Sequence, residues 1–237
     1  MENKIILITG ANSGIGKATA TALAEMGAHV VMMSRDIDKG LEARQEVVAI
    51  SKNNQVDLMQ CDLASFASIR RFAAEFHEKY SRLDVLINNA GYLIKKPIKE
   101  LTQADFQKSL RVNFLGPVEL IQFLSSRMEV NGAHVVNIST MGAFQGSAKF
   151  PELAAYASSK TALCNFTEVY AEENKDRNIR MNCLCLGAVQ TEMLAEAFPG
   201  YIAKISAEEM ADFISDFAIN KGLFFNGKII PVSNSTP

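Results

Sequence analysis

The strongest constraint on the fold is a regular alternation of short apolar runs with longer segments of helical periodicity. The run from Lys4 to Thr9, for example, is apolar at four consecutive positions. Unbroken runs of this kind are typical of strands covered on both faces, as in parallel sheets. The alternation predicts a doubly wound α/β fold, with a seven-stranded, mostly parallel sheet, right-handed crossovers and helices on both faces. Strands are expected near residues 4–9, 28–34, 55–61, 83–88, 133–139, 179–186 and 228–232, and helices near 14–26, 38–50, 65–80, 102–128, 154–174 and 207–220.

A single domain over residues 1–237 accounts for the length, because a chain of this size buries about 70–75% of its unfolded surface in one core. The net charge of −2 and the pI near 6.0 argue against nucleic acid or an anionic membrane surface as a partner. No apolar run approaches the ~20 residues of a membrane span. Because Met1 to Lys4 lead directly into a strand-like run, a cytoplasmic location is expected.

The four cysteines, Cys61, Cys164, Cys183 and Cys185, include no C-x-x-C pair. The last two alternate along an apolar, strand-like run, which favours buried core thiols over a disulfide or a metal site. The three histidines are scattered along the chain. No metal-binding set is therefore expected.

Tyr156 and Lys160 stand near the start of an expected helix with the spacing Tyr-x-x-x-Lys. At this spacing both side chains project from one helical face. A lysine ~4 Å from a phenolate stabilises it by about 4 kcal/mol at an effective dielectric of about 20, which corresponds to roughly three pKa units. A tyrosine of ordinary pKa ~10 would then act as an acid or base near neutral pH. An exposed pair on a helix surface is the alternative explanation.

A glycine-rich turn follows the first expected strand, with the sequence Thr-Gly-Ala-Asn-Ser-Gly-Ile-Gly at 9–16. Glycines permit a tight turn and let a pyrophosphate approach the free amides of a helix N-terminus. A tight turn that binds no ligand is the alternative. Between a strand and a helix, the pattern favours cofactor binding by Gly10, Asn12, Ser13, Gly14, Ile15 and Gly16.

Several motifs together resemble the short-chain dehydrogenase/reductase family. They are T-G-x-x-x-G-I-G at 9–16, Asn88-Asn89-Ala90-Gly91, Asn113, Ser139 and Tyr156-x-x-x-Lys160. The resemblance covers about residues 4–232, and the glycine spacing is similar to the compact branch of the family. It implies a Rossmann-type fold that binds NAD or NADP, hydride transfer between nicotinamide and a carbonyl or alcohol, and assembly as a homotetramer or homodimer.

The resemblance also implies roles for individual residues. Tyr156 would donate a proton to the substrate carbonyl during reduction, Lys160 would stabilise the phenolate and bind the nicotinamide ribose, and Ser139 would orient the reacting oxygen. For Ser139, the alternative is a serine that caps the turn after its strand. The implied cofactor contacts are Asp62, Leu63, Asn89, Ala90, Gly91, Gly187, Val189 and Thr191, with loop capping as the alternative for Asp62.

Asn113 lies inside the long helix expected near 102–128, and Pro117 follows it by four residues. A proline within a helix supplies no amide to the carbonyl four residues before it. The Asn113 carbonyl would then be free for a water-mediated proton relay to Lys160, which is the role that the resemblance implies. A simple kink at Gly116-Pro117 is the alternative.

Cofactor choice depends on Ser34, Arg35 and Asp36, at the end of the second expected strand. NAD-binding proteins of this fold place an acid at this strand end, whereas an arginine accommodates the 2′-phosphate of NADP. Asp36 stands slightly later and suits the N-cap of the next helix. The sequence therefore favours NADP over NAD, with Ser34 and Arg35 as contacts. A solvated surface charge is the alternative for Arg35.

Two departures from the family pattern concern the substrate side. Leu186-Gly187 replaces the Pro-Gly that many relatives have, and the interval from Ser139 to Tyr156 is a few residues longer than usual. A short helix near 191–198 is expected within a substrate lid near 188–205. The apolar side chains that could line the pocket are Tyr92, Leu93, Ile94, Phe144, Phe150, Met193, Leu194 and Phe198.

These features predict an NADP-preferring oxidoreductase that acts on a carbonyl or secondary alcohol with an apolar portion. A 3-oxoacyl-[acyl-carrier-protein] reductase is one alternative, although Lys95, Lys96 and Lys99 are few for a basic docking patch. A nucleotide-binding sensor without turnover is another, and the complete catalytic set argues against it.

Overall fold

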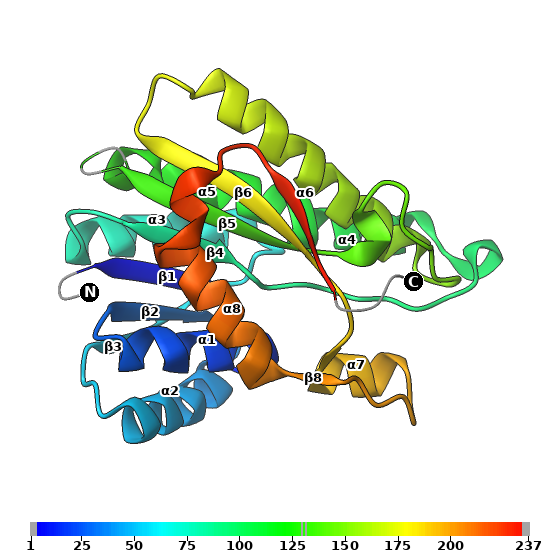
Figure 1. Cartoon of the computed structure of the whole chain (residues 1–237), viewed down its shortest axis with the longest axis horizontal. Coiled ribbons are helices and arrows are strands. Elements are labelled where there is room, and N and C mark those ends of the chain that lie inside the picture. Colours follow the sequence, from blue (N-terminus) through cyan, green and yellow to red (C-terminus); the bar gives the residue numbers. More distant parts are fainter. Residues whose placement is uncertain (1–3, 129, 131, 234–237) are drawn as a thin grey trace.

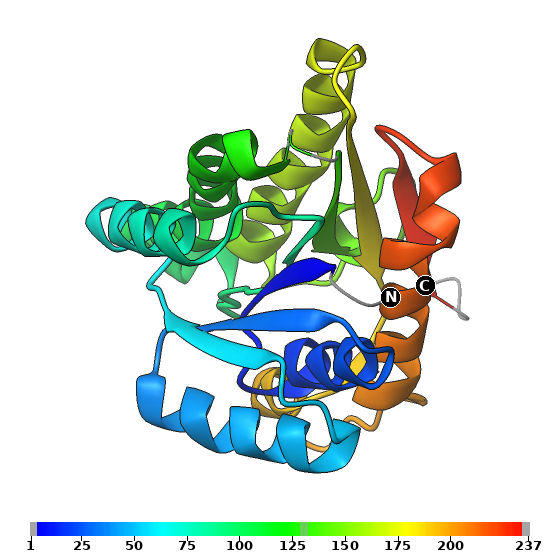
Figure 2. The ribbon, with the colours of Figure 1, turned by 90° about the vertical axis from the view of Figure 1, so that its left-hand side faces the viewer.

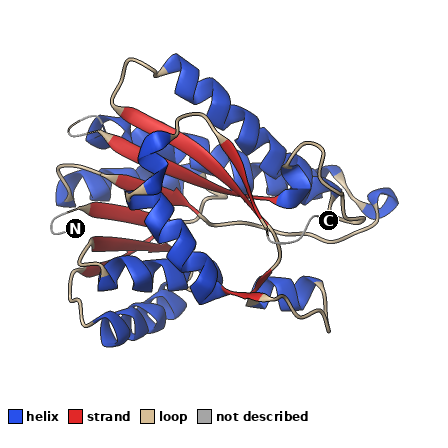
Figure 3. Cartoon of the chain, in the orientation of Figure 1, coloured by secondary structure: helices blue, strands red, loops and turns tan. Residues whose placement is uncertain are grey.

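The computed structural model describes residues 4–128, 130 and 132–233, which form a central sheet between two layers of helices (Figures 1 and 3). The strands are β1 Ile5–Thr9, β2 His29–Ser34, β3 Val56–Gln60, β4 Val85–Asn88, β5 Ala133–Thr140, β6 Ile179–Leu186, β7 Val189–Gln190, β8 Ile205–Ser206 and β9 Ile229–Val232. The helices are α1 Gly14–Glu25, α2 Ile37–Ser51, α3 Phe66–Lys79, α4 Gln103–Leu110, α5 Gly116–Met128, α6 Ala154–Glu173, α7 Glu192–Ala197 and α8 Ala207–Ile219, with 3₁₀ segments at Ile98–Glu100, Met141–Ala143 and Lys221–Phe224.

The central sheet has the strand order β3-β2-β1-β4-β5-β6-β9. Every pairing within it is parallel, with Ile8 of β1 opposite Met32 of β2 and Ile87 of β4. The doubly wound α/β prediction is therefore confirmed. The strand order reverses direction between β1 and β4, and in open α/β sheets ligands bind in the crevice at the carboxyl ends of the strands at such a point.

Successive residues of the strands pack into separate cores on the two faces of the sheet. Ile6 and Ile8 contact the core formed with α1, α2 and α8, whereas Leu7 between them contacts the core formed with α3 and α5. Figure 2 shows α1 and α2 on one side of the sheet, and α3 and α5 on the other. The unbroken apolar run in β1 is explained by this burial on both faces.

The long helix expected near 102–128 is not a regular α-helix. A π-helical segment, Arg111–Leu115, joins α4 to α5, so the turn around Asn113 is wider than an α-turn. The sequence prediction of one α-helix is wrong here, because apolar periodicity does not distinguish an α-turn from a single π-turn. No helix in the described ranges is long and apolar enough to cross a membrane.

Residues 188–205 leave the central sheet after β6 and include the short helix α7. Their base is held by the small parallel ladder of β7 and β8, which pairs Val189 with Ile205. The side chain of Gln190 accepts a hydrogen bond from the Ala203 amide at 2.9 Å. The ladder was not expected from the sequence, because each of its strands has only two residues.

Candidate active site

The sequence-predicted site residues gather around a cavity of about 940 Å³ at the carboxyl ends of the strands. One wall comes from the loop after β1, another from the loops after β4 and β5, and a third from the segment after β6. Two predicted residues, Ser34 and Asn113, do not line this cavity. The predicted residues that do line it are Gly10, Asn12, Ser13, Gly14, Ile15, Gly16, Arg35, Asp62, Leu63, Asn89, Ala90, Gly91, Ser139, Tyr156, Lys160, Gly187, Val189 and Thr191.

The N-terminus of α1 opens onto the cavity without a side-chain cap. Ser13 is the N-cap residue, but its hydroxyl accepts no hydrogen bond from the first turn, and that turn contains no acidic residue. The first amides of a helix have no intrahelical partner, and they favour an anion. A pyrophosphate group fits this end of the helix because the amides are free and the approach is lined by glycine.

Two glycines of the loop are required by close packing. Gly10 has φ +64°, a conformation that favours glycine. A Cβ on Gly16 would collide with the Gly10 carbonyl and with the Asn89 side chain. That side chain holds the loop through hydrogen bonds from Nδ2 to the carbonyl oxygens of Thr9, at 3.0 Å, and Gly10, at 3.2 Å. Asn89 therefore fixes the glycine turn in addition to lining the cavity.

The end of β2 places two cations at the cavity and closes the N-terminus of α2. Asp36 is the N-cap of α2, and its Oδ1 accepts hydrogen bonds from the amides of Asp38 and Lys39, each at 3.1 Å. Its carboxylate is thus engaged by the helix, in agreement with the N-cap prediction. Arg35 and Lys39 are exposed and line the cavity. Lys39 was missed by the sequence reasoning, although its place in the first turn after Arg35 was a usable signal.

Ser34 is buried and its hydroxyl donates to the carbonyl of Asp36 at 2.7 Å. The side chain therefore shapes the β2–α2 turn. The predicted cofactor contact at Ser34 has no support in the cavity lining, because the hydroxyl faces its own loop.

Ser139, Tyr156 and Lys160 come together where β5 meets the N-terminal half of α6. Lys160 is only 2% exposed, and its Nζ donates to the carbonyl of Ile138 at 2.8 Å. The Ser139 hydroxyl donates to the carbonyl of Lys160 at 3.3 Å. All three residues line the cavity, so a group bound there would meet a hydroxyl, a phenol and an ammonium group.

Burial shifts the pKa of both titratable residues in this trio. It raises the pKa of Tyr156 to about 12, because desolvation penalises the phenolate. It lowers the pKa of Lys160 to about 8, because desolvation penalises the ammonium group. The expectation that Lys160 lowers the Tyr156 pKa is wrong for this arrangement: the ammonium group is bonded to Ile138, and no hydrogen bond joins the two side chains within the described part of the chain.

Asn113 is fully buried beside Lys160, and its side chain holds the loop after β4 by hydrogen bonds. Its Oδ1 accepts from the Tyr92 amide at 2.7 Å, and its Nδ2 donates to the Tyr92 carbonyl and to the Ser159 hydroxyl, both at 2.9 Å. A Cβ on Gly91 would lie 3.6 Å from Lys160 Nζ and 3.7 Å from Asn113 Oδ1, so both polar groups border the same glycine.

The π-turn changes the argument about the Asn113 carbonyl. In this segment the amide five residues on closes the ring, as the Gly116 amide does to the Arg111 carbonyl. For Asn113 the residue five positions on is Val118, which has an amide, unlike Pro117. The spacing to Pro117 therefore does not by itself leave the carbonyl free, and the relay stays a prediction.

Three further predicted cofactor contacts also hold the loops around the cavity. Asp62 accepts a hydrogen bond from the Ala64 amide at 2.9 Å, which is the loop-capping alternative. Thr191 is the N-cap of α7 and accepts from the Leu194 amide at 3.2 Å. The Gly187 amide donates to the Val232 carbonyl at 2.9 Å, so this loop is anchored to β9 although Leu186 stands where relatives have proline.

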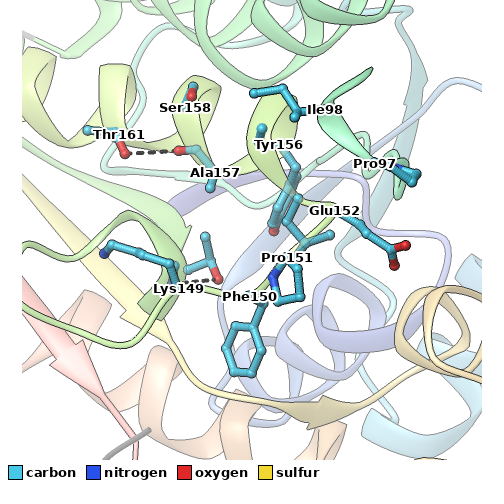
Figure 4. A pocket seen from close by; sticks show the side chains of 14 residues that line it. Pro97, Ile98, Lys149, Phe150, Pro151, Glu152, Tyr156, Ala157, Ser158 and Thr161 are labelled. Atoms are coloured by element: carbon cyan, nitrogen blue, oxygen red, sulfur yellow. Dashed lines mark hydrogen bonds between the residues drawn. The ribbon is translucent and has the colours of Figure 1, made fainter. Parts of the chain in front are cut away.

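A second cavity of about 630 Å³ shares Tyr156 with the first (Figure 4). Pro97, Ile98 and Phe150 contribute to its mainly apolar wall. Of the eight apolar residues expected to line the pocket, six line the first cavity. The two that do not are Ile94 and Phe144. Phe144 instead packs beside Met141 and the cysteines of β6. The six that line the first cavity are Tyr92, Leu93, Phe150, Met193, Leu194 and Phe198.

Comparison with known proteins agrees with this geometry. The sequence profile described as "short chain dehydrogenase" matches residues 4–201. Retinol dehydrogenase 12 of Bos taurus is 36% identical over 205 residues, which is 82% of this chain and 64% of that protein. The chain belongs to the short-chain dehydrogenase/reductase family. It spans less than two thirds of the length of the retinol dehydrogenases that it matches, 60–64% of each.

Solved structures of this family share the fold over nearly the whole chain. A Beutenbergia cavernae protein described as an NAD(P)-dependent gluconate 5-dehydrogenase, with NADP bound at low occupancy, is 28% identical with a TM-score of 0.88 and covers 98% of this chain and 96% of its own. A structure described as a β-ketoacyl-ACP reductase is 26% identical with a TM-score of 0.83, and the match covers 99% of this chain and 98% of that one. The Rossmann-type fold implied by the sequence resemblance is confirmed.

Proposed function

We propose that this chain is an NADP-preferring oxidoreductase that transfers a hydride between nicotinamide and a carbonyl or secondary alcohol. The observation that carries the proposal is the shared cavity: Ser139, Tyr156 and Lys160 lie at one part of it, and the open N-terminus of α1 lies at another. Such a cavity can hold a dinucleotide by its phosphates and present its reactive end to an acid–base group.

The cofactor, when bound, supplies or accepts the hydride. The protein residues donate or remove the proton. Tyr156 donates its phenolic proton to the carbonyl oxygen during reduction and takes the hydroxyl proton during oxidation. Ser139 turns its hydroxyl from the Lys160 carbonyl to the reacting oxygen and orients it. To stabilise the phenolate left on Tyr156, the buried Lys160 ammonium group turns from the Ile138 carbonyl toward the phenolate oxygen. Asn113 holds the Tyr92 backbone beside this centre.

The preference for NADP rests on the groups at the end of β2. Arg35, Asp36 and Lys39 all line the cavity, but Oδ1 of Asp36 accepts hydrogen bonds from the α2 amides. A 2′-phosphate favours two nearby cations, whereas a 2′-hydroxyl favours an available carboxylate. The bound NADP in the Beutenbergia cavernae relative supports the same choice.

The substrate is expected to have an apolar portion. The two cavities that share Tyr156 are lined by Phe150, Leu153 and, in the larger one, Met193. Apolar walls favour apolar ligands. The relative from Bos taurus is a retinol dehydrogenase, and retinol is an alcohol with a long hydrocarbon portion. Residues 188–205 would cover such a substrate as a lid, because Met193, Leu194 and Phe198 line the cavity.

An acyl-carrier-protein substrate is the second candidate because of the structural similarity to the β-ketoacyl-ACP reductase. Docking of an acidic carrier requires free cations near the cavity. Lys95 and Lys96, however, pair with Glu152 at 3.5 Å and Asp105 at 3.2 Å. The small-molecule substrate is therefore preferred. A homotetrameric or homodimeric assembly and a cytoplasmic location remain parts of the proposal that rest on the sequence.

The test is a panel of apolar and polar ketones and alcohols, measured by nicotinamide absorbance with NADPH, NADP, NADH and NAD. We expect the highest kcat/KM with NADP(H) and with a substrate that has an apolar chain or ring. Binding of NADPH with no turnover on any member of the panel would instead support the sensor alternative. A preference for acyl-carrier-protein thioesters over free apolar ketones would support the second candidate.

A further inference from the structure

Three of the four cysteines converge beneath the reacting centre, although they come from two elements. Cys183 and Cys185 lie on one face of β6, and Cys164 of α6 packs against both. Cys183 and Cys185 are fully buried, and Cys164 is 7% exposed. No disulfide joins them, because all four cysteines of the chain are free. The cluster plays no part in the proposed reaction.

Two of the three distances between the sulfur atoms match the edges of a zinc coordination tetrahedron. The Sγ of Cys164 lies 3.7 Å from the Sγ of Cys183 and 3.7 Å from the Sγ of Cys185. All three sulfur atoms lie within 4.8 Å of one another. A Zn–S bond of ~2.3 Å gives a tetrahedral S···S edge of about 3.8 Å. The thiols could therefore hold a zinc ion after only small side-chain movements.

The Ser139 hydroxyl lies next to one of the three sulfur atoms and is the candidate for the fourth ligand. The Ser139 hydroxyl is 3.3 Å from the Sγ of Cys164. For Zn–S of ~2.3 Å and Zn–O of ~2.1 Å, the tetrahedral S···O edge is about 3.6 Å. Ser139 also lines the cavity, so a hydrated cation could reach the thiols past this side chain.

The surrounding charge also suits a divalent ion. Three thiolates and one Zn²⁺ carry a net charge of −1, and the Lys160 ammonium group close to all three thiols carries +1. A buried charge is tolerated when it is paired.

We propose that Cys164, Cys183 and Cys185 form a binding site for a thiophilic divalent cation such as Zn²⁺, which takes the Ser139 hydroxyl as its fourth ligand and thereby stops catalysis. Three Zn–S bonds form, the three thiols lose their protons to solvent, and the hydroxyl of Ser139 binds as a neutral ligand. No oxidation or reduction is involved. Only the inhibition rests on the proposed function, since binding by itself requires no turnover.

The binding test uses the full chain without a histidine tag, treated with a chelator and a reductant and then titrated with Cd²⁺ as a spectroscopic substitute for Zn²⁺. We expect one equivalent of Cd²⁺ to produce the ultraviolet charge-transfer absorption of a site with three thiolates. Zn²⁺ should displace it. In Cys164→Ala the affinity should fall by about a hundredfold or more, since even loss of a group behind a ligand costs about 10–100-fold.

Cys61→Ala is the matched control, because it removes the buried cysteine that lies outside the cluster. It should retain the absorption and the affinity for Cd²⁺. Cys183→Ala and Cys185→Ala are tested separately. Each removes a different ligand, so the test still decides if one variant does not fold. Parental affinity in all three cluster variants, or absence of thiolate absorption in the parent, would overturn the site.

The functional arm measures turnover and NADPH binding at buffered free Zn²⁺. Zn²⁺ should lower kcat of the parent and of Cys61→Ala, while NADPH affinity measured by fluorescence stays unchanged. Ser139→Ala should keep the charge-transfer absorption but bind Cd²⁺ about tenfold more weakly, because it retains the thiolates and lacks the hydroxyl. Unchanged affinity in Ser139→Ala would refute the fourth ligand. Since absorption does not depend on turnover, an inactive parent would contradict the proposed function and leave the binding result decisive.

Discussion

Polar groups are exposed at one end of the cavity and buried at the other. We call the part lined by the α1 N-terminus, Arg35 and Lys39 the cofactor end, and the part lined by Ser139, Tyr156 and Lys160 the reacting end. At the cofactor end, the first amides of α1 have no side-chain cap, and Arg35 and Lys39 are exposed. At the reacting end, Lys160 and Ser139 are buried and hydrogen-bonded to backbone carbonyls. Polar groups that face water can bind a charged ligand with little desolvation, whereas buried groups have shifted pKa values. The two ends therefore suit binding and proton transfer, respectively.

The two helices that begin at the cofactor end show the same contrast on a smaller scale. The α2 N-terminus is closed by Asp36, which accepts from two amides of the first turn. The α1 N-terminus begins with Ser13 and Gly14 and has no such bond. A carboxylate at the start of α1 would occupy the amides and repel a phosphate. The first turn of α1 thus has no carboxylate of its own, and the Glu192 carboxylate beside Gly14 comes from α7. The α2 terminus instead holds Asp36 between Arg35 and Lys39.

The largest expected effect concerns the reacting end. Tyr156→Phe removes the proposed proton donor, so turnover should fall by about a thousandfold, within the range known for general acid–base catalysis. NADPH binding should stay nearly intact, because the cofactor end is unchanged. Steady-state rates and NADPH fluorescence titration test this, with Tyr80→Phe as a control that removes a phenol bonded to Asp57 at 2.5 Å, away from the cavity. Near-parental turnover of Tyr156→Phe would remove Tyr156 from the mechanism.

Lys160 should make stability depend on pH in a defined direction. Its pKa is lowered from 10.5 to about 8, so between these values the unfolded chain binds a proton that the folded chain does not. Stability should therefore rise with pH through this window, by up to about 3 kcal/mol in total. Urea unfolding of the parent and of Lys160→Met across the window between the two pKa values, from pH 7 to pH 10.5, measures the difference. The exposed Lys79→Met serves as control, and identical slopes for parent and Lys160→Met would exclude the buried ammonium as the cause.

At the cofactor end, Arg35→Ala should weaken NADPH binding about ten- to a hundredfold, because charge-assisted hydrogen bonds contribute ~1.5–3 kcal/mol. NADH binding should barely change, since NADH has no 2′-phosphate. Lys39→Ala should show the same selectivity with a smaller loss, and Arg70→Ala on the surface of α3 should change neither affinity. Equal losses of affinity for NADPH and NADH would mean that Arg35 does not bind the 2′-phosphate.

The smallest expected effect concerns the π-helical segment Arg111–Leu115, which joins α4 to α5. Pro117→Ala offers the Asn113 carbonyl an amide four residues on, so the segment can tighten into an α-helix. We expect a few-fold loss in the single-turnover rate and a thermal stability at least equal to that of the parent, because proline in a helix interior costs ~3 kcal/mol. Val118→Ala leaves the backbone donors unchanged and is the control. An equal single-turnover rate across the pH range would make the π-turn purely structural.

Much of the fold could be read from local patterns. The strand starts and ends lie within two residues of the expected ones, and Asp36 caps α2 as expected. The glycine turn also follows from sequence, since positive φ at Gly10 and close packing at Gly16 need residues without a side chain. These features depend on neighbours in the chain, so short stretches contain the necessary information.

Other features required contacts between distant segments. The direction of the Lys160 ammonium group is decided by the Ile138 carbonyl on β5, and this contact overturned the expected effect on Tyr156. The π-turn around Asn113 replaced a regular helix without any change in apolar periodicity. Lys39 could have been identified from its place after Arg35, but its position at the cavity depends on how α2 packs on the sheet.

The sequence by itself determined the alternation of strands and helices, the family, and the residue types available for the reaction, because these depend on periodicity and on motifs of a few residues. Only the tertiary structure placed Cys164 against Cys183, Cys185 and Ser139. No spacing in the chain encodes that cluster, since it arises from the packing of one face of α6 on alternate residues of β6. The burial of Lys160 has the same origin, and burial is what shifts its pKa.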